Sequence, residues 1–140
     1  MRAVLDPNVL IAALISSIGS PARLLLAWKA GRSELIVSAL LLEELERALA
    51  YPKLRRRVPA DQAAAAVQWL RRDATVRPDP RDGPPVRAVD PGDDYLIALA
   101  AAERALLVSG DDHLLRLEGS IPVLSPSAFL ARLGEASPEP

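Results

Sequence analysis

Short, continuous apolar runs alternate along this chain with longer segments in which apolar residues recur at helical spacing. The runs predict buried strands, and the longer segments predict helices. Strands are expected at residues 2–5, 35–37, 74–77, 106–109 and 121–124. Helices are expected at residues 7–15, 20–30, 38–50, 53–57, 59–73, 95–105, 111–117 and 125–133, with Ser20 and Ser38 as the N-caps of the second and third. This alternation is typical of a parallel sheet covered on both faces, so we predict a three-layer α/β/α fold with a central, mainly parallel, five-stranded sheet.

The turn-forming and loop-forming residues of the chain define one domain, which is expected to span residues 1–133. Proline and glycine are dense between residues 78 and 91, which predicts a loop. The segment 95–105 is apolar on nearly all sides, and is therefore expected to be buried on several sides or to lie in a dimer interface. There are no internal repeats, and residues 134–140 are expected to form a flexible C-terminal tail.

Composition narrows the class of protein. Half of the 140 residues are hydrophobic, enough for one domain with a substantial core, and cysteine is absent, which excludes thiolate sites. No apolar run approaches the ~18 residues of a membrane span. The first apolar stretch is interrupted at Asp6, unlike a signal peptide. We therefore expect a soluble, cytoplasmic protein.

Charge is balanced overall but clustered locally. The net charge is −1, whereas Lys53, Arg55, Arg56 and Arg57 form one basic block and Arg71 and Arg72 another. Two interpretations stay open: solvated helix faces, or basic flanks of a site that receives a phosphodiester.

Four acidic positions stand beside apolar runs. Asp6, Asp111 and the pair Asp93–Asp94 could each be a helix N-cap, which is worth about 1 kcal/mol. Glu44 caps nothing, because it lies well inside its predicted helix. On the wheel of that helix Glu43 points away from the apolar arc, while Glu44 and Glu46 stand at its edges. Periodicity therefore does not choose between Glu44 and Glu46.

Topology offers a second explanation for these acids. The carboxyl ends of parallel strands share one edge of a sheet, and ligands bind there where the winding direction changes. Asp6 and Asp111 follow predicted strands and are placed at that edge. Converging carboxylates repel one another unless they are protonated or neutralised, and a hard divalent cation is the usual neutraliser. This pattern indicates a Mg²⁺- or Mn²⁺-dependent enzyme acting on phosphate esters.

Four ordered segments carry a resemblance to a known family. They are Val4-Leu5-Asp6-Pro7-Asn8, the helix from Ser38 through Glu44-Leu45, Asp90-Pro91-Gly92-Asp93-Asp94-Tyr95-Leu96-Ile97-Ala98, and Leu107-Val108-Ser109-Gly110-Asp111. In this order and spacing they resemble the motifs of PIN-domain ribonucleases, most closely the VapC-like toxins of toxin–antitoxin pairs. The resemblance selects Glu44 over Glu46 and puts Asp94 in the acid position, with Asp93 as its companion. Pro7 departs from the usual hydroxyl residue, and His113 stands where the family often has another acid.

The resemblance implies a PIN-like fold and a metal-dependent endoribonuclease. Mg²⁺ or Mn²⁺ would be held by Asp6, Glu44, Asp93, Asp94 and Asp111. Asn8 would orient the substrate or a ligand, and a polar residue in the first turn of a helix is an equally good explanation of it. RNA as substrate, a small antitoxin as partner, and a homodimer follow from the same resemblance.

Two alternative functions of the chain depend on particular residues. A catalytically impaired PIN scaffold, binding RNA or a protein without cleavage, stays open because of Pro7. A phosphoacceptor receiver domain would need a lysine late in the chain, and none follows Lys53. His113 is expected at the surface, and Trp28 and Trp69 are expected to pack in the core or an interface rather than to stack on bases.

Overall fold

The computed structural model describes residues 1–136, with side-chain environments through residue 134. Its five strands pair in parallel throughout, in the order β3-β2-β1-β4-β5. The strands are β1 (Arg2–Leu5), β2 (Glu34–Val37), β3 (Thr75–Val76), β4 (Leu106–Val108) and β5 (Val123–Leu124). The predicted α/β fold with a five-stranded parallel sheet is confirmed.

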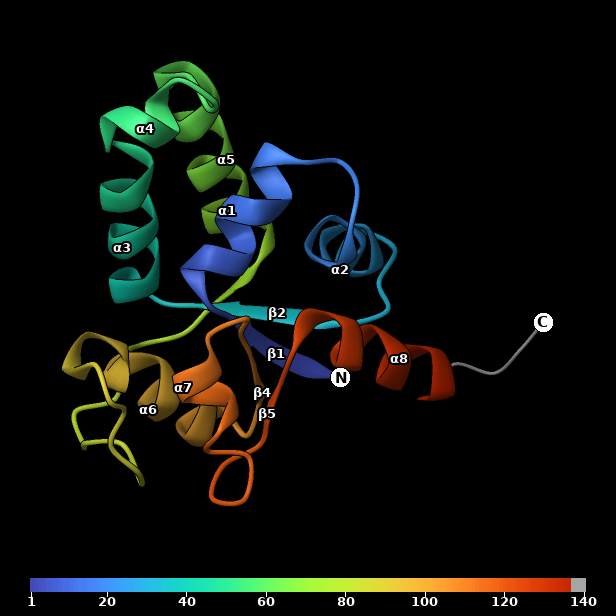
Figure 1. The fold of residues 1–140 in the computed structure, drawn as a ribbon, viewed down its shortest axis with the longest axis vertical. Helices are drawn as coiled ribbons and strands as arrows, with labels where there is room; N and C mark the ends of the chain where they lie inside the picture. Colours follow the sequence, from blue (N-terminus) through green and yellow to red (C-terminus); the bar gives the residue numbers. More distant parts are fainter. Residues whose placement is uncertain (137–140) are drawn as a thin grey trace.

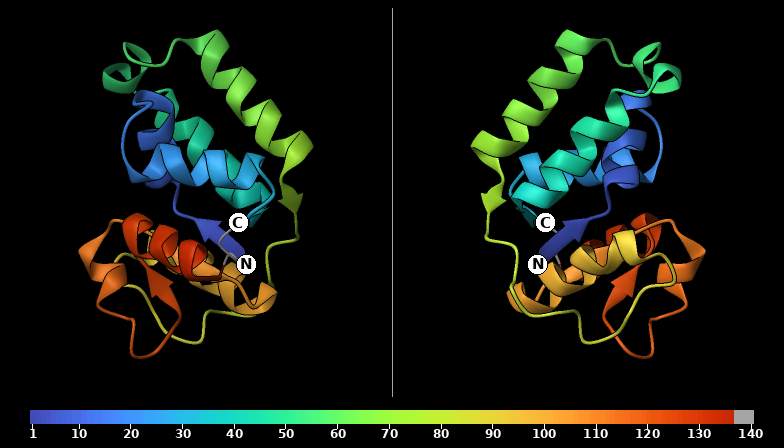
Figure 2. Two further views of the ribbon diagram at one scale, coloured as in Figure 1. Left: turned by 90° about the vertical axis from the view of Figure 1, so that its right-hand side faces the viewer. Right: turned by 90° about the vertical axis from the view of Figure 1, so that its left-hand side faces the viewer.

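Helices cover both faces of the sheet. They are α1 (Pro7–Ile15), α2 (Ser20–Lys29), α3 (Ala39–Leu49), α4 (Pro52–Arg55), α5 (Ala60–Asp73), α6 (Asp94–Glu103), α7 (Asp112–Leu115) and α8 (Pro126–Ala136), with a short 3₁₀ turn η1 (Pro91–Asp93). Helices α1, α2, α3 and α5 lie on one side of the sheet, and α6 and α7 lie on the other (Figure 1). Figure 2 shows the same separation from both ends, with α8 beside α2, which it contacts.

Element boundaries differ from the sequence prediction by one to three residues at many ends, as three examples show. Gly19, at φ 105°, occupies the N-cap position of α2, and Ser20 is its first helical residue rather than its cap. Strand β5 covers only the last two residues of the predicted range. Helix α8 continues to Ala136, three residues past its predicted end, and the rest of the predicted tail, residues 137–140, lies outside the described residues.

The core lies on both faces of the sheet and explains why the strands read as unbroken apolar runs. Val4, Ile36 and Leu107, from three adjacent strands, are fully buried. On α3 the helical spacing buries Leu41, Leu45 and Leu49 against this core and leaves Glu43 exposed, as the wheel predicts.

Helix α6 is buried by its own chain. Its apolar run Leu96–Ala100 is buried without interruption, and the helix contacts β1 and β4. The prediction that it is buried on several sides is confirmed.

No single helix within residues 1–136 is long and apolar enough to cross a membrane. Helices α1 and α2, bent by 95° at their junction, meet that length and composition only as a pair, and both contribute buried residues to the core.

Candidate functional site

The strand order places a crevice at the carboxyl ends of β1 and β4. From β1 the chain winds outward to β2 and β3, then returns to add β4 and β5 on the other side of β1. Winding therefore reverses between β1 and β4, which is where open parallel sheets bind ligands. Pairing of Leu5 with Val108 brings the next residues, Asp6 and Ser109, side by side.

Polar residues are buried at this edge and nowhere else among residues 1–134. Asp6 is 4% exposed, and Ser109 and Ser38, which follow β4 and β2, are fully buried. Ser38 is satisfied by its position, because its Oγ accepts a hydrogen bond from the Leu41 amide and caps α3 as predicted.

Asp6 has both carboxylate oxygens engaged. Oδ1 accepts a hydrogen bond from the Asn8 amide at 3.0 Å and thereby caps α1, while Oδ2 accepts one from Ser109 Oγ at 2.8 Å. Burial raises the pKa of Asp6, the two hydrogen bonds lower it, and the charge of Asp111 raises it further. The side chain is thus a helix cap and at the same time part of an acidic group, so the two explanations of its presence do not exclude each other.

Asp111 lies beside Asp6 and is fixed by the same serine. Its amide donates to Ser109 Oγ at 3.0 Å, and its Oδ1 accepts from the His113 amide at 2.8 Å, which caps α7. His113 is exposed, as expected for a surface residue. Asn8, also exposed, lines with Asp111 an open hollow of about 420 Å³ at the rim of the crevice.

Asp93 is the acid of η1 that faces the group. Partial burial is the largest cause that raises its pKa to about 6, and the charges of Asp6, Asp90, Asp111 and Glu44 add to it. Each of these charges acts on Asp93, although the acids come from four separate parts of the chain, with Asp90 and Asp93 in the same turn.

The motif puts Asp94 in the acid position. Both carboxylate oxygens of this residue are bound by residues of the proline-rich loop. Its Oδ1 accepts a hydrogen bond from the Ala88 amide at 2.7 Å, and its Oδ2 forms an ion pair with Arg87 at 3.4 Å. Asp93 or Asp94 is expected to cap α6. Asp93 does occupy the N-cap position, but its side chain makes no capping hydrogen bond there.

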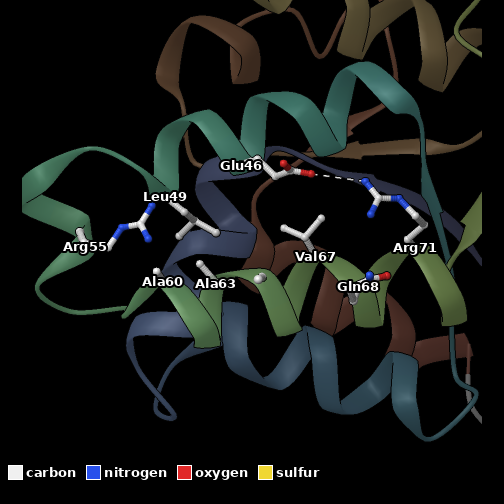
Figure 3. Close-up of a pocket in the computed structure, with 9 residues that line it drawn as sticks. Glu46, Leu49, Arg55, Ala60, Ala63, Val67, Gln68 and Arg71 are labelled. Atoms are coloured by element: carbon white, nitrogen blue, oxygen red, sulfur yellow. Dashed lines mark hydrogen bonds and ion pairs between the residues drawn. The ribbon is translucent and has the colours of Figure 1, made fainter.

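The structure separates the two glutamates of α3 that periodicity left open. Glu44 pairs with Arg47 at 2.8 Å, keeps a half-exposed side chain, and is the one whose charge acts on Asp93. Glu46 instead lines a pocket of about 290 Å³ between α3 and α5, where it pairs with Arg71 at 3.3 Å (Figure 3). The site therefore gathers Asp6, Glu44, Asp93 and Asp111.

These donors suit a hard divalent cation in chemistry, since all are carboxylates and their charges repel one another as they stand. They do not form a closed ligand set. Within residues 1–136 no three His, Cys, Asp or Glu side chains are close enough together to hold a metal ion by themselves. An open set of this kind fits Mg²⁺, which usually keeps several of its waters.

Two residues beside the acids escaped sequence reasoning. Burial and the charges of Glu44, Asp6, Asp93 and Asp79 raise the pKa of Tyr95 well above its ordinary value. The signal for Tyr95 was its position, as the one polar group among apolar residues directly after Asp93 and Asp94. Asp79 carried no signal, because an acid in a proline-rich loop is ordinarily solvated. Trp28 and Trp69, by contrast, pack on each other against the core, as predicted, with 4.9 Å between their ring centroids.

Among known protein families, the family model described as PIN domain matches residues 2–113 of this chain. Among curated proteins none matches the chain. The fold is similar to the structure of VapBC2 from Rickettsia felis bound to a DNA fragment of its promoter, at 14% identity and a TM-score of 0.64 over 89% of this chain and 98% of that one.

Two further structures share the fold. FitAcB from Neisseria gonorrhoeae aligns at 16% identity and a TM-score of 0.59 over 89% of this chain and 98% of that one. A PilT N-terminus domain protein from the archaeon Sulfolobus solfataricus P2 aligns at 17% identity and a TM-score of 0.57 over 100% of this chain and 99% of that one.

Proposed function

Because the chain belongs to the PIN-domain family, we propose that it is a metal-dependent endoribonuclease and the toxin of a toxin–antitoxin pair. The observation that carries this proposal is that the Ser109 hydroxyl at the end of β4 binds both the Asp6 carboxylate and the Asp111 amide, which brings these two acids together where the sheet reverses its winding. The pKa of Asp93, raised by burial and by the charges of Asp6, Asp111 and Glu44, supports the inclusion of Asp93 and Glu44.

We assign Asp6, Glu44, Asp93 and Asp111 to hold Mg²⁺ or Mn²⁺. Asp94 is then a positioning residue, because the loop occupies both of its oxygens. A bound ion makes water a better nucleophile and offsets the charge that builds on phosphate oxygens. Neutralising the acids also relieves the repulsion within the group.

The chain's own residues fix this arrangement. The hydroxyl of Ser109 joins β1 to β4 by bonding both Asp6 and the Asp111 amide, which sets the spacing of those two acids. Asn8, exposed at the rim of the hollow beside Asp111, is placed to orient an RNA phosphate. Water is the proposed nucleophile, since cysteine is absent and the single histidine is exposed.

A basic turn supports RNA as the substrate. Lys53, Arg55, Arg56 and Arg57 follow directly after α3, the helix that carries Glu44, and none of the four has an ion-pair partner among the described residues. Unpaired cations at the end of the helix that carries Glu44 suit a polyanion whose backbone must be held while one phosphodiester is cut. We propose this turn as a backbone-binding surface.

An antitoxin partner is proposed from the structural neighbours, because VapBC2 and FitAcB are toxin–antitoxin complexes. We also propose that the protein forms a homodimer and acts in the cytoplasm. The alternative is a PIN scaffold that binds RNA or a protein without cleavage. Pro7 supports that alternative, since it is buried beside Asp6 and offers no hydroxyl.

Incubation of the purified protein with total RNA tests the proposal. Cleavage is expected with Mn²⁺ and should yield 5′-phosphate ends on mapping. It should stop with EDTA and in Asp6→Asn, while Asp61→Asn, which changes an exposed acid on α5, should cut normally. RNA fragments that persist under chelation, or equally in Asp6→Asn, would exclude this chemistry.

A further inference from the structure

Two buried polar side-chain atoms have no hydrogen-bond partner among the described residues, and they lie in the same region. They are Oδ1 of Asp79 and the hydroxyl oxygen of Tyr95. Asp79 is held at the start of α3 through the Leu40 amide, and its charge is among those that raise the pKa of Tyr95. A buried polar atom without a partner is costly, and in a native protein each such atom calls for an explanation.

The two atoms are complementary. An ionised carboxylate only accepts hydrogen bonds, whereas a phenol at neutral pH donates one. The other charged groups acting on Tyr95 are Glu44, Asp6 and Asp93, all of them acceptors. Among these acceptors within the described residues, only Asp79 Oδ1 is a buried oxygen without a hydrogen bond.

Asp79 connects the proline-rich loop to the helix that carries Glu44. Its second oxygen, Oδ2, accepts a hydrogen bond from the Leu40 amide at 3.0 Å, at the start of α3. Leu40 lies four residues before Glu44, which is about one helical turn. In Figure 1 the loop passes the start of α3 on its way from α5 to α6.

Tyr95 lies at the other end of this connection, two residues after Asp93. It follows Asp93 and Asp94 directly, in the first turn of α6. The far end of the loop holds Asp94 through Ala88 and Arg87. A bond between Tyr95 and Asp79 would therefore close a connection from α3, through the loop, to α6.

We propose that Asp79 and Tyr95 are paired positioning residues that set the spacing between Glu44 and Asp93. The Tyr95 hydroxyl donates to Asp79 Oδ1 through one ordered water, which satisfies both atoms. This inference rests on the proposed function for its metal, while the pair itself belongs to the metal-free fold.

A double-mutant cycle on the metal-free protein tests the pair. Tyr95→Phe, Asp79→Ala and the double variant are unfolded in urea at pH 7. The pair predicts that the double variant loses less stability than the sum of the single losses, because the second substitution finds the bond already gone. Loss of the α3 cap occurs in both Asp79 variants and cancels in the cycle. Strictly additive losses would overturn the pair.

Binding of Mn²⁺, measured by electron paramagnetic resonance of the free ion, tests the positioning role. Tyr95→Phe should weaken Mn²⁺ binding by about threefold to tenfold, the effect of one hydrogen bond. Tyr51→Phe, at a tyrosine that is 59% exposed, should bind like the wild type.

The outcomes separate this inference from the proposed function. Coupled stabilities with wild-type Mn²⁺ affinity in Tyr95→Phe would overturn the positioning role. A wild-type protein that binds no Mn²⁺ and cuts no RNA would overturn the proposed function, and the positioning role with it. The cycle would then still decide whether the pair exists.

Discussion

At the scale of the residue, the site is built from side chains that serve the fold and the chemistry together. Asp6 caps α1 with one oxygen and binds Ser109 with the other. Asp93 has no such structural bond, and its pKa is raised to about 6. A charged group held among like charges without compensation destabilises the fold, which proteins tolerate at functional sites.

Asp93→Asn is therefore expected to stabilise the metal-free protein. The folded-state pKa of about 6 lies above the ordinary value of 3.8, so the folded protein keeps a proton that the unfolded chain has released. Stability accordingly falls as pH rises through that window, and the penalty is complete above pH 6.

Urea unfolding without metal at pH 4 and pH 8 measures the effect. Allowing for solvent screening, Asp93→Asn should gain about 1 kcal/mol over the wild type at pH 8 and almost nothing at pH 4. Asp61→Asn serves as the control. A variant less stable than the wild type at pH 8 would show that Asp93 is not held against repulsion.

At the scale of the element, the sequence pattern predicted all five strands and every α-helix of the described residues, though not the 3₁₀ turn η1, because burial of strands and amphipathic helices leaves a direct pattern. Periodicity did not decide which acid faces the site in two pairs. Glu44 and Glu46 stand at opposite edges of one apolar arc, and only the packing of α5 shows which edge faces the site. Asp93 and Asp94 are adjacent, and their directions depend on the turn from η1 into α6 and on a loop whose course no local pattern encodes.

Asp94→Ala and Asp93→Ala should separate the two adjacent acids. Asp94→Ala removes the bond to the Ala88 amide and should lower the free energy of unfolding by about 1 kcal/mol while metal-dependent RNA cleavage by the folded fraction persists. Asp93→Ala should abolish cleavage. Thermal unfolding and a cleavage assay on both variants measure this, and the assignment reverses if Asp94→Ala is the inactive one.

At the scale of the whole molecule, charge is divided between regions although the sum is only −1. Acids gather at the carboxyl edge of the sheet, and four cations follow α3 in the turn 53–57. Composition alone could not assign that turn, since a solvated helix end has the same residues. The turn lies at the end of α3 that points away from the sheet, so its role in RNA binding is part of the proposal (Figure 1).

Arg56→Ala with Arg57→Ala should reduce the salt dependence of RNA binding. Each lost contact to a single strand lowers the slope of log affinity against log salt by about 0.7, so the double variant should lose about 1.4. Arg23→Ala with Arg132→Ala removes the same charge from exposed positions on α2 and α8 and should leave the slope unchanged. Equal slopes in all three proteins, measured by fluorescence anisotropy with EDTA present, would dissociate the basic turn from RNA.

The most direct measurement is a crystal structure of the protein grown with Mn²⁺ and recorded at a wavelength where manganese scatters anomalously. We predict an anomalous peak at the carboxyl ends of β1 and β4, within coordination distance, about 2 to 2.5 Å, of a carboxylate oxygen of Asp6, Asp93 or Asp111, with the remaining acids reached through the waters of the ion. A crystal saturated with Mn²⁺ that shows no peak there, with Asp6 bound only to Asn8 and Ser109, would contradict the metal-dependent nuclease.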